Sequence, residues 1–296
     1  MNTYDYDWVD AFADRPFGGN GCVVVHSAGD IDTETRMTLV RETSLSECAF
    51  IVPSERADFG ARYYLAAREI LMAGHPTVAT VISLVSRGLV DVSGGRAEFS
   101  LEVGAGVLPI EVECSANGQV QVTMTQQAPT FHHIHQPKDI ATIYGLSSDD
   151  IVGIPETVST GSYFGITVLK DKDALHRAQL DVGALQAYVD SGKGDFTEPF
   201  LVTLGGETEN GDTFSRLLLP PPMPPEDPFT GSATGCMAAY LWRHGLVENP
   251  DFIAEQGHWM HRPGQAKVQV LGPRENISGI RVGGRGYILM SGKLHL

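Results

Sequence analysis

The sequence is poor in cysteine and has no long apolar segment. Its four cysteines form no CxxC motif and show no paired spacing. They indicate no disulfide framework, and reduced thiols in a cytosolic protein are expected. No apolar run reaches the roughly 20 residues that span a membrane. The chain starts MNTYDYD, which is acidic where a signal peptide is basic. We therefore expect a cytoplasmic protein with no membrane partner.

Positive charge is also scarce. Lys and Arg number 21 against 36 Asp and Glu, so the formal net charge is −15 at pH 7. Nucleic acids and anionic membranes attract basic surfaces, so neither is expected as a partner. Apolar residues make up 42% and charged residues 19% of the chain, which is typical of a globular protein. Its 296 residues can form two domains that each bury a core.

One stretch, residues 226–235 with the sequence EDPFTGSATG, organises the rest of the chain. The proline-rich residues 220–225 before it predict an extended backbone, and the apolar residues after it predict a helix that begins beyond Pro228. Backbone N–H groups near Gly231 and Ser232 would then lie at a helix N-terminus. Such a position attracts anions, because its amides lack helical partners and the helix dipole is positive there.

The same pattern occurs earlier, at residues 73–88. These residues align without a gap on residues 230–245, with Gly74 on Gly231 and Gly88 on Gly245. Both copies begin with a glycine turn, continue apolar on all sides and stop at glycine, which predicts two buried helices. We infer an internal duplication and an α/β (α+β) fold of two pseudo-symmetric domains. Each domain is expected to be a curled, mostly antiparallel sheet or barrel around its buried helix, with both helix starts facing a common cleft.

We expect the domains to span residues 1–125 and 126–296, although the last strand could cross back to the first domain. Residues 126–139, which are polar and contain two prolines, are the expected link. A helix is expected at 31–42 with Asp30 as its N-cap, and a second one at 182–190. Strands are expected at 6–12, 22–26, 49–52, 62–65, 97–103, 108–113, 119–125, 164–169, 200–204, 215–219, 265–271, 277–282 and 287–290.

Four polar residues near these turns are candidates for chemistry. Glu47 stands before an apolar strand, where partial desolvation would raise its pKa toward the range useful for proton transfer. His75 lies between glycine and proline at the first helix start, and Asp227 and Ser232 flank the second. Each alone also fits a surface, capping or packing role. Their combination at two duplicated turns favours a site in a cleft.

Several motifs resemble the phenazine-biosynthesis PhzF-like family, and the resemblance runs from about residue 8 to 290. The matching segments are DAFADRPFGGN (10–20), LSECAF (45–50), AGHPT (73–77), EDPFTGSA (226–233) and QG…RPG (256–264). The family is similar in fold to diaminopimelate epimerase, which has two pseudo-symmetric halves, each a curled sheet around one helix. This agrees with the duplication inferred above.

The resemblance implies a role for each candidate. Glu47 falls on the acid/base glutamate that moves a proton between carbons of a dihydro-hydroxyanthranilate substrate. His75 and Asp227 fall on residues that hold and polarise the substrate, while the Gly74 turn and the turn at Gly231 and Ser232 offer donors for its carboxylate. The family requires no metal and no organic cofactor, and it implies a homodimer. A small carboxylate is thus the expected partner.

The sequence departs from the family pattern at several places around these residues. The family's Asn-Pro-x-Ala reads NGCV at 20–23, and its usual N-L-S-E-T has Ser44 and Cys48 at the two ends. Leu71 replaces a proline, and residues 65–66 replace a Thr-Pro pair. These changes would line the pocket or its approach. The reaction class is therefore predicted more firmly than the substrate.

The residues at the two turns disfavour two other reactions. A two-thiol racemase needs one cysteine at each glycine turn, but 73–75 and 230–232 contain none and Cys236 lies further on. A Ser/His/Asp hydrolase is disfavoured because Ser232 lacks the glycines of a nucleophile elbow. A small-carboxylate binding protein of the same fold without catalysis, or a related epimerase, remains the alternative.

Three remaining patterns are interpreted as structural. The histidines of FHHIH at 131–135 fall in the expected link and are taken as a solvated loop rather than a metal site. The spacing of His258 and His261 has no helical context, so these residues are also taken as structural. The glycines of GGRG at 283–286 predict a hairpin turn.

Overall fold

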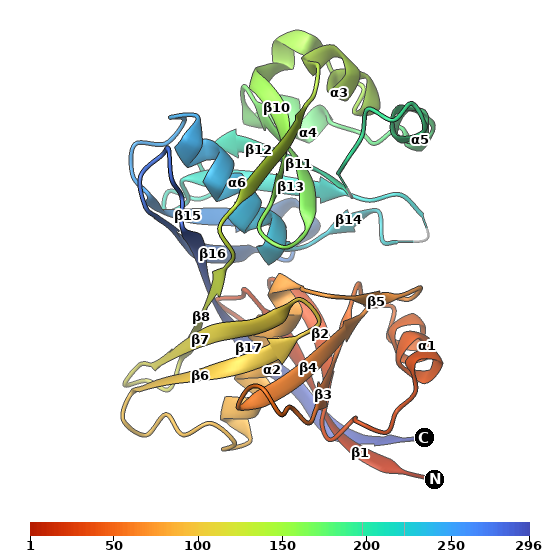
Figure 1. Ribbon diagram of the computed structural model, residues 1–296, viewed down its shortest axis with the longest axis vertical. Coiled ribbons are helices and arrows are strands. Elements are labelled where there is room, and N and C mark those ends of the chain that lie inside the picture. The colour runs from red at the N-terminus through yellow and green to blue at the C-terminus, as the bar shows by residue number, and fades with distance from the viewer. Residues whose placement is uncertain (197, 222) are drawn as a thin grey trace. The chain divides into compact units, whose positions relative to one another are not determined.

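The computed structural model describes residues 1–196, 198–221 and 223–296. The chain divides into two compact units (Figure 1). Unit 1 comprises Met1–Thr125 and Gly283–Leu296, and unit 2 comprises Gln126–Val282. Residues 283–296, whose placement the sequence left open, are thus grouped with unit 1. Pro222, in the expected proline-rich approach, lies outside the described residues.

Unit 1 contains a closed β-barrel. Its elements are β1 (Thr3–Ala11), β2 (Asn20–Val25), α1 (Thr33–Thr43), β3 (Cys48–Val52), β4 (Phe59–Tyr64), β5 (Glu69–Ile70), α2 (Gly74–Ser86), β6 (Arg96–Val103), β7 (Gly106–Cys114) and most of β8 (Val120–Gln126) and β17 (Gly279–His295), both of which cross the unit boundary. The ring runs β1-β2-β3-β4-β6-β7-β8-β17 and closes by the antiparallel pairing of β17 with β1. Within it, the β2–β3 and β4–β6 pairs are parallel. Since closure leaves the ring without edge strands, the barrel is protected from pairing with other chains.

Unit 2 repeats this order of pairings. Its elements are β9 (Thr130–Ile134), α3 (Pro137–Ile143), a 3-10 turn (Ser148–Asp150), β10 (Ile151–Ser159), β11 (Tyr163–Leu169), α4 (Lys172–Arg177), α5 (Val182–Asp190), β12 (Glu198–Leu204), β13 (Thr213–Leu218), β14 (Glu226–Asp227), α6 (Gly231–Arg243), β15 (Asp251–Gln256), a second 3-10 turn (His258–Met260) and β16 (Gly264–Leu271). From β10 to β16 the pairs are antiparallel, parallel, antiparallel, parallel and antiparallel, as from β1 to β7. The predicted duplication is confirmed.

The two buried helices are the second sign of the duplication. Helices α2 and α6 have 13 residues each, and the first eleven residues of both are buried. Gly88 and Gly245 follow the helix ends with φ of +68° and +67°, the left-handed conformation that favours glycine. Pro76 is the third residue of α2 and lies in its first turn.

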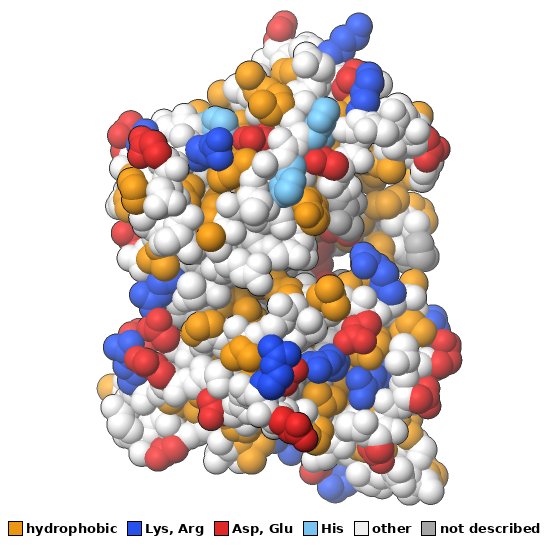
Figure 2. Space-filling view, in the orientation of Figure 1, with side chains coloured by type: hydrophobic (Ala, Val, Ile, Leu, Met, Phe, Trp, Pro, Cys, Tyr) orange, Lys and Arg blue, Asp and Glu red, His pale blue; other side chains and the backbone are white. Residues whose placement is uncertain are grey.

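The expected inter-domain link is wrong for most of its length. Thr130–Ile134 form β9, which pairs with β10, and α3 begins at Pro137. Within the histidine run, His132 and His133 are exposed but His135 is fully buried. Histidine side chains show on the surface of this unit in Figure 2. The prediction from polar composition was wrong because a strand can also expose many of its side chains, and β9 exposes four of its five residues.

The predicted hairpin at 283–286 is also wrong, because β17 continues through it. The glycines serve close approach instead of a turn. A Cβ at Gly284 would lie 2.3 Å from the Phe12 ring, and one at Gly286 would lie 2.5 Å from the Asp10 carbonyl oxygen. Any larger residue would push β17 away from β1. The two short strands expected at 277–282 and 287–290 are therefore parts of one.

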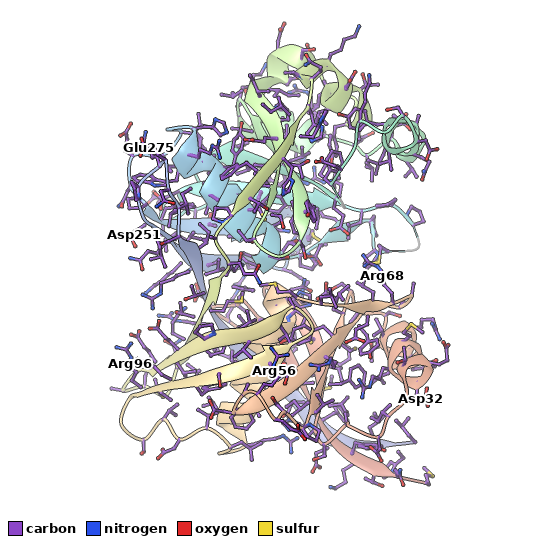
Figure 3. All side chains as sticks on the ribbon, viewed as in Figure 1. Asp32, Arg56, Arg68, Arg96, Asp251 and Glu275 are labelled. Atoms are coloured by element: carbon purple, nitrogen blue, oxygen red, sulfur yellow. The ribbon has the colours of Figure 1, made fainter. Side chains whose placement is uncertain are left out.

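The start of helix α1 differs from the predicted one, because a capping side chain sets it. Helix α1 starts at Thr33 rather than at residue 31, and its N-cap is Asp32, labelled in Figure 3, rather than Asp30. The Asp32 carboxylate accepts hydrogen bonds from the Thr35 backbone N–H and hydroxyl, both at 2.9 Å.

None of the helices in the described part of the chain is long and apolar enough to cross a membrane. Acidic and basic side chains are interspersed on the visible faces of both units (Figure 2).

His135 makes the stability of unit 2 depend on pH. Its Nε2 lies 2.7 Å from the Thr157 hydroxyl, which donates to Asp195, so Nε2 is the donor and Nδ1 accepts from the Tyr188 hydroxyl at 2.8 Å. Burial, with His133 nearby, lowers the pKa of His135 to about 4. Because the folded pKa lies below the unfolded value of about 6.5, the stabilisation is complete above pH 6.5. It is lost as the pH falls toward 4.

We expect this loss to reach about 1.4 kcal/mol per pH unit at its steepest, the slope for one proton. Urea unfolding of the wild type and His135→Gln at pH 7, 6, 5 and 4.5 measures it, with the exposed His132→Gln as the matched control. His135→Gln should be less stable at pH 7 and flatter with pH, while His132→Gln follows the wild type. Equal slopes for all three proteins would contradict the assignment.

Candidate active site

In unit 1, the structure brings Glu47 and His75 together. Glu47 is the residue before β3, and His75 is the second residue of α2. The Glu47 Oε2 lies 3.8 Å from the His75 Nδ1, and the two side chains are 19% and 4% exposed. Gly74, the first residue of α2, precedes His75 and is also buried. A carboxylate that keeps some access to solvent thus lies beside a buried imidazole.

Asn20, the first residue of β2, is a third member of this group that motif analysis did not single out. Its side-chain Nδ2 lies 3.2 Å from the same nitrogen of His75, and Asn20 is 3% exposed. The sequence signal was present, since Asn20 ends the DAFADRPFGGN segment. Only the pairing of strands around α2 shows that residues 20 and 75 meet.

The thiol and phenol groups near Glu47 stay protonated near neutral pH. Burial raises the pKa of Cys48 to about 12 and raises those of Cys22 and Tyr63 above their ordinary values. Tyr63 donates to the Thr77 hydroxyl at 2.9 Å, since that hydroxyl itself donates to the Ala73 carbonyl oxygen at 2.6 Å. These bonds hold the first turn of α2. The Glu47 carboxylate is therefore the better-suited group here for moving a proton.

In unit 2, Asp227 belongs to a turn fastened by its own polar groups. The Thr230 hydroxyl donates to Asp227 Oδ2 at 2.6 Å. Gln256 accepts from the Thr230 backbone N–H at 3.0 Å and donates to the Asp227 carbonyl oxygen at 2.8 Å. Gln256, at the end of β15, was not among the predicted site residues although its motif was noted. It keeps Asp227 and the start of α6 in fixed geometry.

Gly231 and Ser232 are the first two residues of α6 and are both buried. The Gly231 carbonyl oxygen accepts from the Gln126 side chain at 2.9 Å, and Thr230 is the N-cap. Neither N-cap residue, Thr230 of α6 or Ala73 of α2, caps its helix through a side-chain hydrogen bond. The first amides of an uncapped helix are suited to bind a carboxylate. The two helix starts thus share this property, as the duplication predicts.

The thiols of the chain do not have the properties of a racemase pair. All four are free, and Cys236 is fully buried inside α6. Burial raises the pKa of Cys236 to about 11, as it raises that of Cys48. A thiol must ionise to act as a base or nucleophile. Neither group does so readily near neutral pH.

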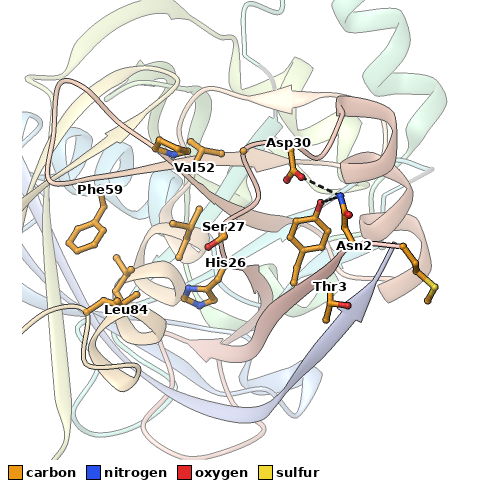
Figure 4. A pocket seen from close by; sticks show the side chains of 14 residues that line it. Asn2, Thr3, His26, Ser27, Asp30, Val52, Phe59 and Leu84 are labelled. Carbon is orange, nitrogen blue, oxygen red and sulfur yellow. Dashed lines mark hydrogen bonds between the residues drawn. The ribbon is translucent and has the colours of Figure 1, made fainter.

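A second polar cluster in unit 1 resembles a catalytic triad in composition only. His26 Nε2 lies 2.7 Å from the Ser83 hydroxyl and 3.3 Å from Asp7 Oδ2. In a triad the two partners contact different ring nitrogens, so this geometry cannot pass a proton from serine through histidine. His26 borders a pocket of about 830 Å³ (Figure 4), whose lining does not include Glu47 or His75. We interpret the cluster as structural.

The described residues contain no group of three or more His, Cys, Asp and Glu side chains arranged to hold a metal ion. The histidine run at 131–135 is instead part of β9 and the residue that follows it. His135 contacts Tyr188 and Thr157, and its ring packs against Phe196 at 5.0 Å between centroids. The run was expected to be structural, and His135 has packing and hydrogen-bonding contacts rather than the solvated position predicted for it.

Comparison with known proteins places these features in a family. Residues 9–292 match the PhzC-PhzF family profile, described as phenazine biosynthesis-like protein. The chain is 30% identical to an uncharacterised isomerase of Bacillus subtilis over 267 residues, which cover 88% of each chain. It is 27% identical to the trans-2,3-dihydro-3-hydroxyanthranilate isomerase of Pseudomonas aeruginosa, over 98% of this chain and 99% of the relative.

Solved structures agree with the sequence relatives. The PhzF-family phenazine biosynthesis protein of Bacillus anthracis superposes over the full length of both chains with a TM-score of 0.87 at 25% identity. A hydroxyproline epimerase of Agrobacterium vitis shares the fold, with a TM-score of 0.70 at 14% identity over 99% of this chain and 93% of that one. The epimerase-like fold that the family resemblance implied is confirmed.

Proposed function

The chain belongs to the phenazine biosynthesis-like (PhzC-PhzF) family and is an isomerase, and from this premise we propose that Glu47 is its general acid and base. In this reaction the Glu47 carboxylate takes a proton from one carbon of a small carboxylate-bearing substrate. The resulting carboxylic acid returns a proton to another carbon, and the double bonds shift between the two positions. No other atom is gained or lost.

The observation that carries the proposal is the position of Glu47 beside His75. A carboxylate with 19% of its side chain exposed remains accessible to a substrate, and His75 Nδ1 lies only 3.8 Å away. The neighbouring thiols and the Tyr63 phenol keep their protons near neutral pH, because burial raises their pKa values. A carboxylate that both takes and returns a proton contributes about 10²- to 10⁴-fold in rate.

For substrate binding, we propose that the first amides of α6 at Gly231 and Ser232 hold the substrate carboxylate. Asp227 helps to position the substrate, and Gly74 and His75 act in the same way at the start of α2. Support comes from the fastened turn at Asp227 and from the uncapped helix starts. One well-placed donor to a developing negative charge is worth about 3 kcal/mol.

Solvent exchange tests the proposed reaction directly. We expect trans-2,3-dihydro-3-hydroxyanthranilate, or another small unsaturated carboxylate with an acidic C–H bond, to incorporate deuterium at carbon when incubated with the protein in D₂O. NMR detects both the exchange and any isomerised product. Calorimetric binding of such carboxylates without exchange of any of them would contradict the proposal and favour a binding protein of the same fold.

The predicted homodimer and cytoplasmic location are part of the same proposal. Four free cysteines in the described chain support a reducing compartment. Sedimentation equilibrium of the purified protein tests the dimer, which predicts twice the chain mass of 31.9 kDa. Fluorescence imaging of the tagged full chain in its own cells tests the location.

A further inference from the structure

Two side chains favour opposite protonation states of one nitrogen of His75. Asn20 Nδ2 lies 3.2 Å from Nδ1, and Glu47 Oε2 lies 3.8 Å from the same atom. An amide nitrogen has hydrogens but no available lone pair, so Asn20 can only donate and requires an unprotonated Nδ1. A carboxylate instead favours a protonated Nδ1, because it attracts the imidazolium charge.

We propose that Asn20 is a positioning residue that holds His75 as the neutral tautomer with its proton on Nε2, and thereby keeps a cation away from Glu47. The claim about Glu47 rests on the proposed function, whereas the claim about the His75 tautomer does not. In this proposal Asn20 acts through His75 and does not contact the substrate.

Geometry decides between the two demands. The contact with Asn20 is within hydrogen-bond distance, while 3.8 Å to Glu47 is beyond it. Burial acts in the same direction, because His75 is 4% exposed and a charged ring would lose its hydration. Both effects favour neutral His75 over the Glu47–imidazolium pair.

Three other ionisable groups of unit 1 do not reverse the balance. Cys22, Cys48 and Tyr63, on β2, β3 and β4, stay protonated and uncharged near neutral pH, because burial raises their pKa values. Asp10 on β1 is buried, and its carboxylate accepts from the Phe17 backbone N–H at 2.7 Å.

A neutral His75 has two consequences for proton transfer. An imidazolium 3.8 Å from Glu47 would stabilise the ionised form of the Glu47 side chain over the protonated acid. The carboxylate would then be a weaker base toward a carbon-bound proton. Without that cation, Glu47 can both accept and return the proton. The proton on Nε2 also leaves His75 able to donate a hydrogen bond through that nitrogen, which suits the polarising role proposed for it.

Nitrogen-15 NMR of the ligand-free protein tests the tautomer without any substrate. In ¹⁵N-histidine-labelled full chain at pH 7, we expect His75 Nδ1 to be unprotonated and Nε2 protonated, with the signal assigned by its absence in His75→Gln. Asn20→Asp substitutes an acceptor for the donor. It should place a proton on Nδ1 and raise the titration midpoint of His75 by about one to three pH units.

Controls separate this effect from a general change of charge or of fold. Asn276→Asp adds the same charge at an exposed position and should leave His75 unchanged. Asn20→Ser provides a second variant if Asn20→Asp does not fold. A proton on Nδ1 of wild-type His75 at pH 7, or the same His75 titration in Asn20→Asp as in wild type, would overturn the proposal.

Activity then tests the link to Glu47. With any substrate found by deuterium exchange, Asn20→Asp should lower kcat about 10- to 100-fold with little change in KM. An unchanged kcat in a variant whose His75 tautomer has switched would overturn the link. If no carboxylate undergoes exchange, the proposed function fails while the NMR result still decides the tautomer.

Discussion

Replacing Glu47 with Gln is expected to lower kcat/KM for proton transfer by about 10²- to 10⁴-fold. The amide has nearly the shape of the carboxyl group but can neither accept a proton from carbon nor return one. His75, 3.8 Å away and 4% exposed, remains in place because the amide fits the same space. Since binding of the substrate carboxylate is assigned to other groups, KM should change little.

Deuterium exchange and product formation measure this loss in the same NMR experiment. Glu42→Gln is the matched control, because it makes the same change at an exposed residue of α1 and should retain full activity. Glu47→Asp should keep partial activity, since it retains the acid but shortens its reach. Undiminished exchange in Glu47→Gln would remove Glu47 from the mechanism and leave the family assignment intact.

Replacing Asp7 with Ala is expected to destabilise the protein by about 3 to 5 kcal/mol, as when one member of a buried ion pair is removed. The Asp7 side chain is 2% exposed and accepts two hydrogen bonds from Arg87, at 2.6 and 2.9 Å. Ser83 and Ser291 each donate to it at 2.6 Å. The carboxylate thus ties β1 to the end of α2 and to β17.

Urea unfolding at pH 7 measures the effect of the Asp7 change. Asp5→Ala is the matched control, because Asp5 also pairs with Arg87 and Lys293 but its side chain is 47% exposed. Asp5→Ala should move the unfolding midpoint much less than Asp7→Ala does, because water screens an exposed ion pair. Equal unfolding midpoints for Asp7→Ala and the wild type would show that the network contributes nothing to stability.

The Asp7 carboxylate also makes the stability of the protein fall as the pH is lowered. Hydrogen bonds from Arg87, Ser291 and Ser83 lower the pKa of Asp7 to about 2 despite its burial. Because the folded pKa lies below the unfolded value of about 3.9, this contribution is complete above pH 4 and is lost as the pH falls toward 2. Asp7→Ala should therefore show a smaller loss of stability than the wild type in that range.

The two helices and their turns were predictable because their signals are local. An apolar run between glycines predicts a buried helix wherever it lies, and the repeat at residues 73–88 and 230–245 shows the pattern twice. The link at 126–139 and the hairpin at 283–286 were wrong because polar or glycine-rich composition has two physical causes. Exposure of the side chains of β9 explains the first, and close backbone approach at the glycines of β17 explains the second.

The sequence by itself determined the duplicated architecture and the candidates Glu47, His75, Asp227 and Ser232, because turn chemistry and apolar periodicity act over short stretches of chain. Only the tertiary structure decided that Asn20 lies 3.2 Å from His75 and that Gln256 fastens the turn at Asp227. These contacts join residues 55 and 29 positions apart. Strand register and barrel closure set such distances, and the pattern of a single segment carries no information about either.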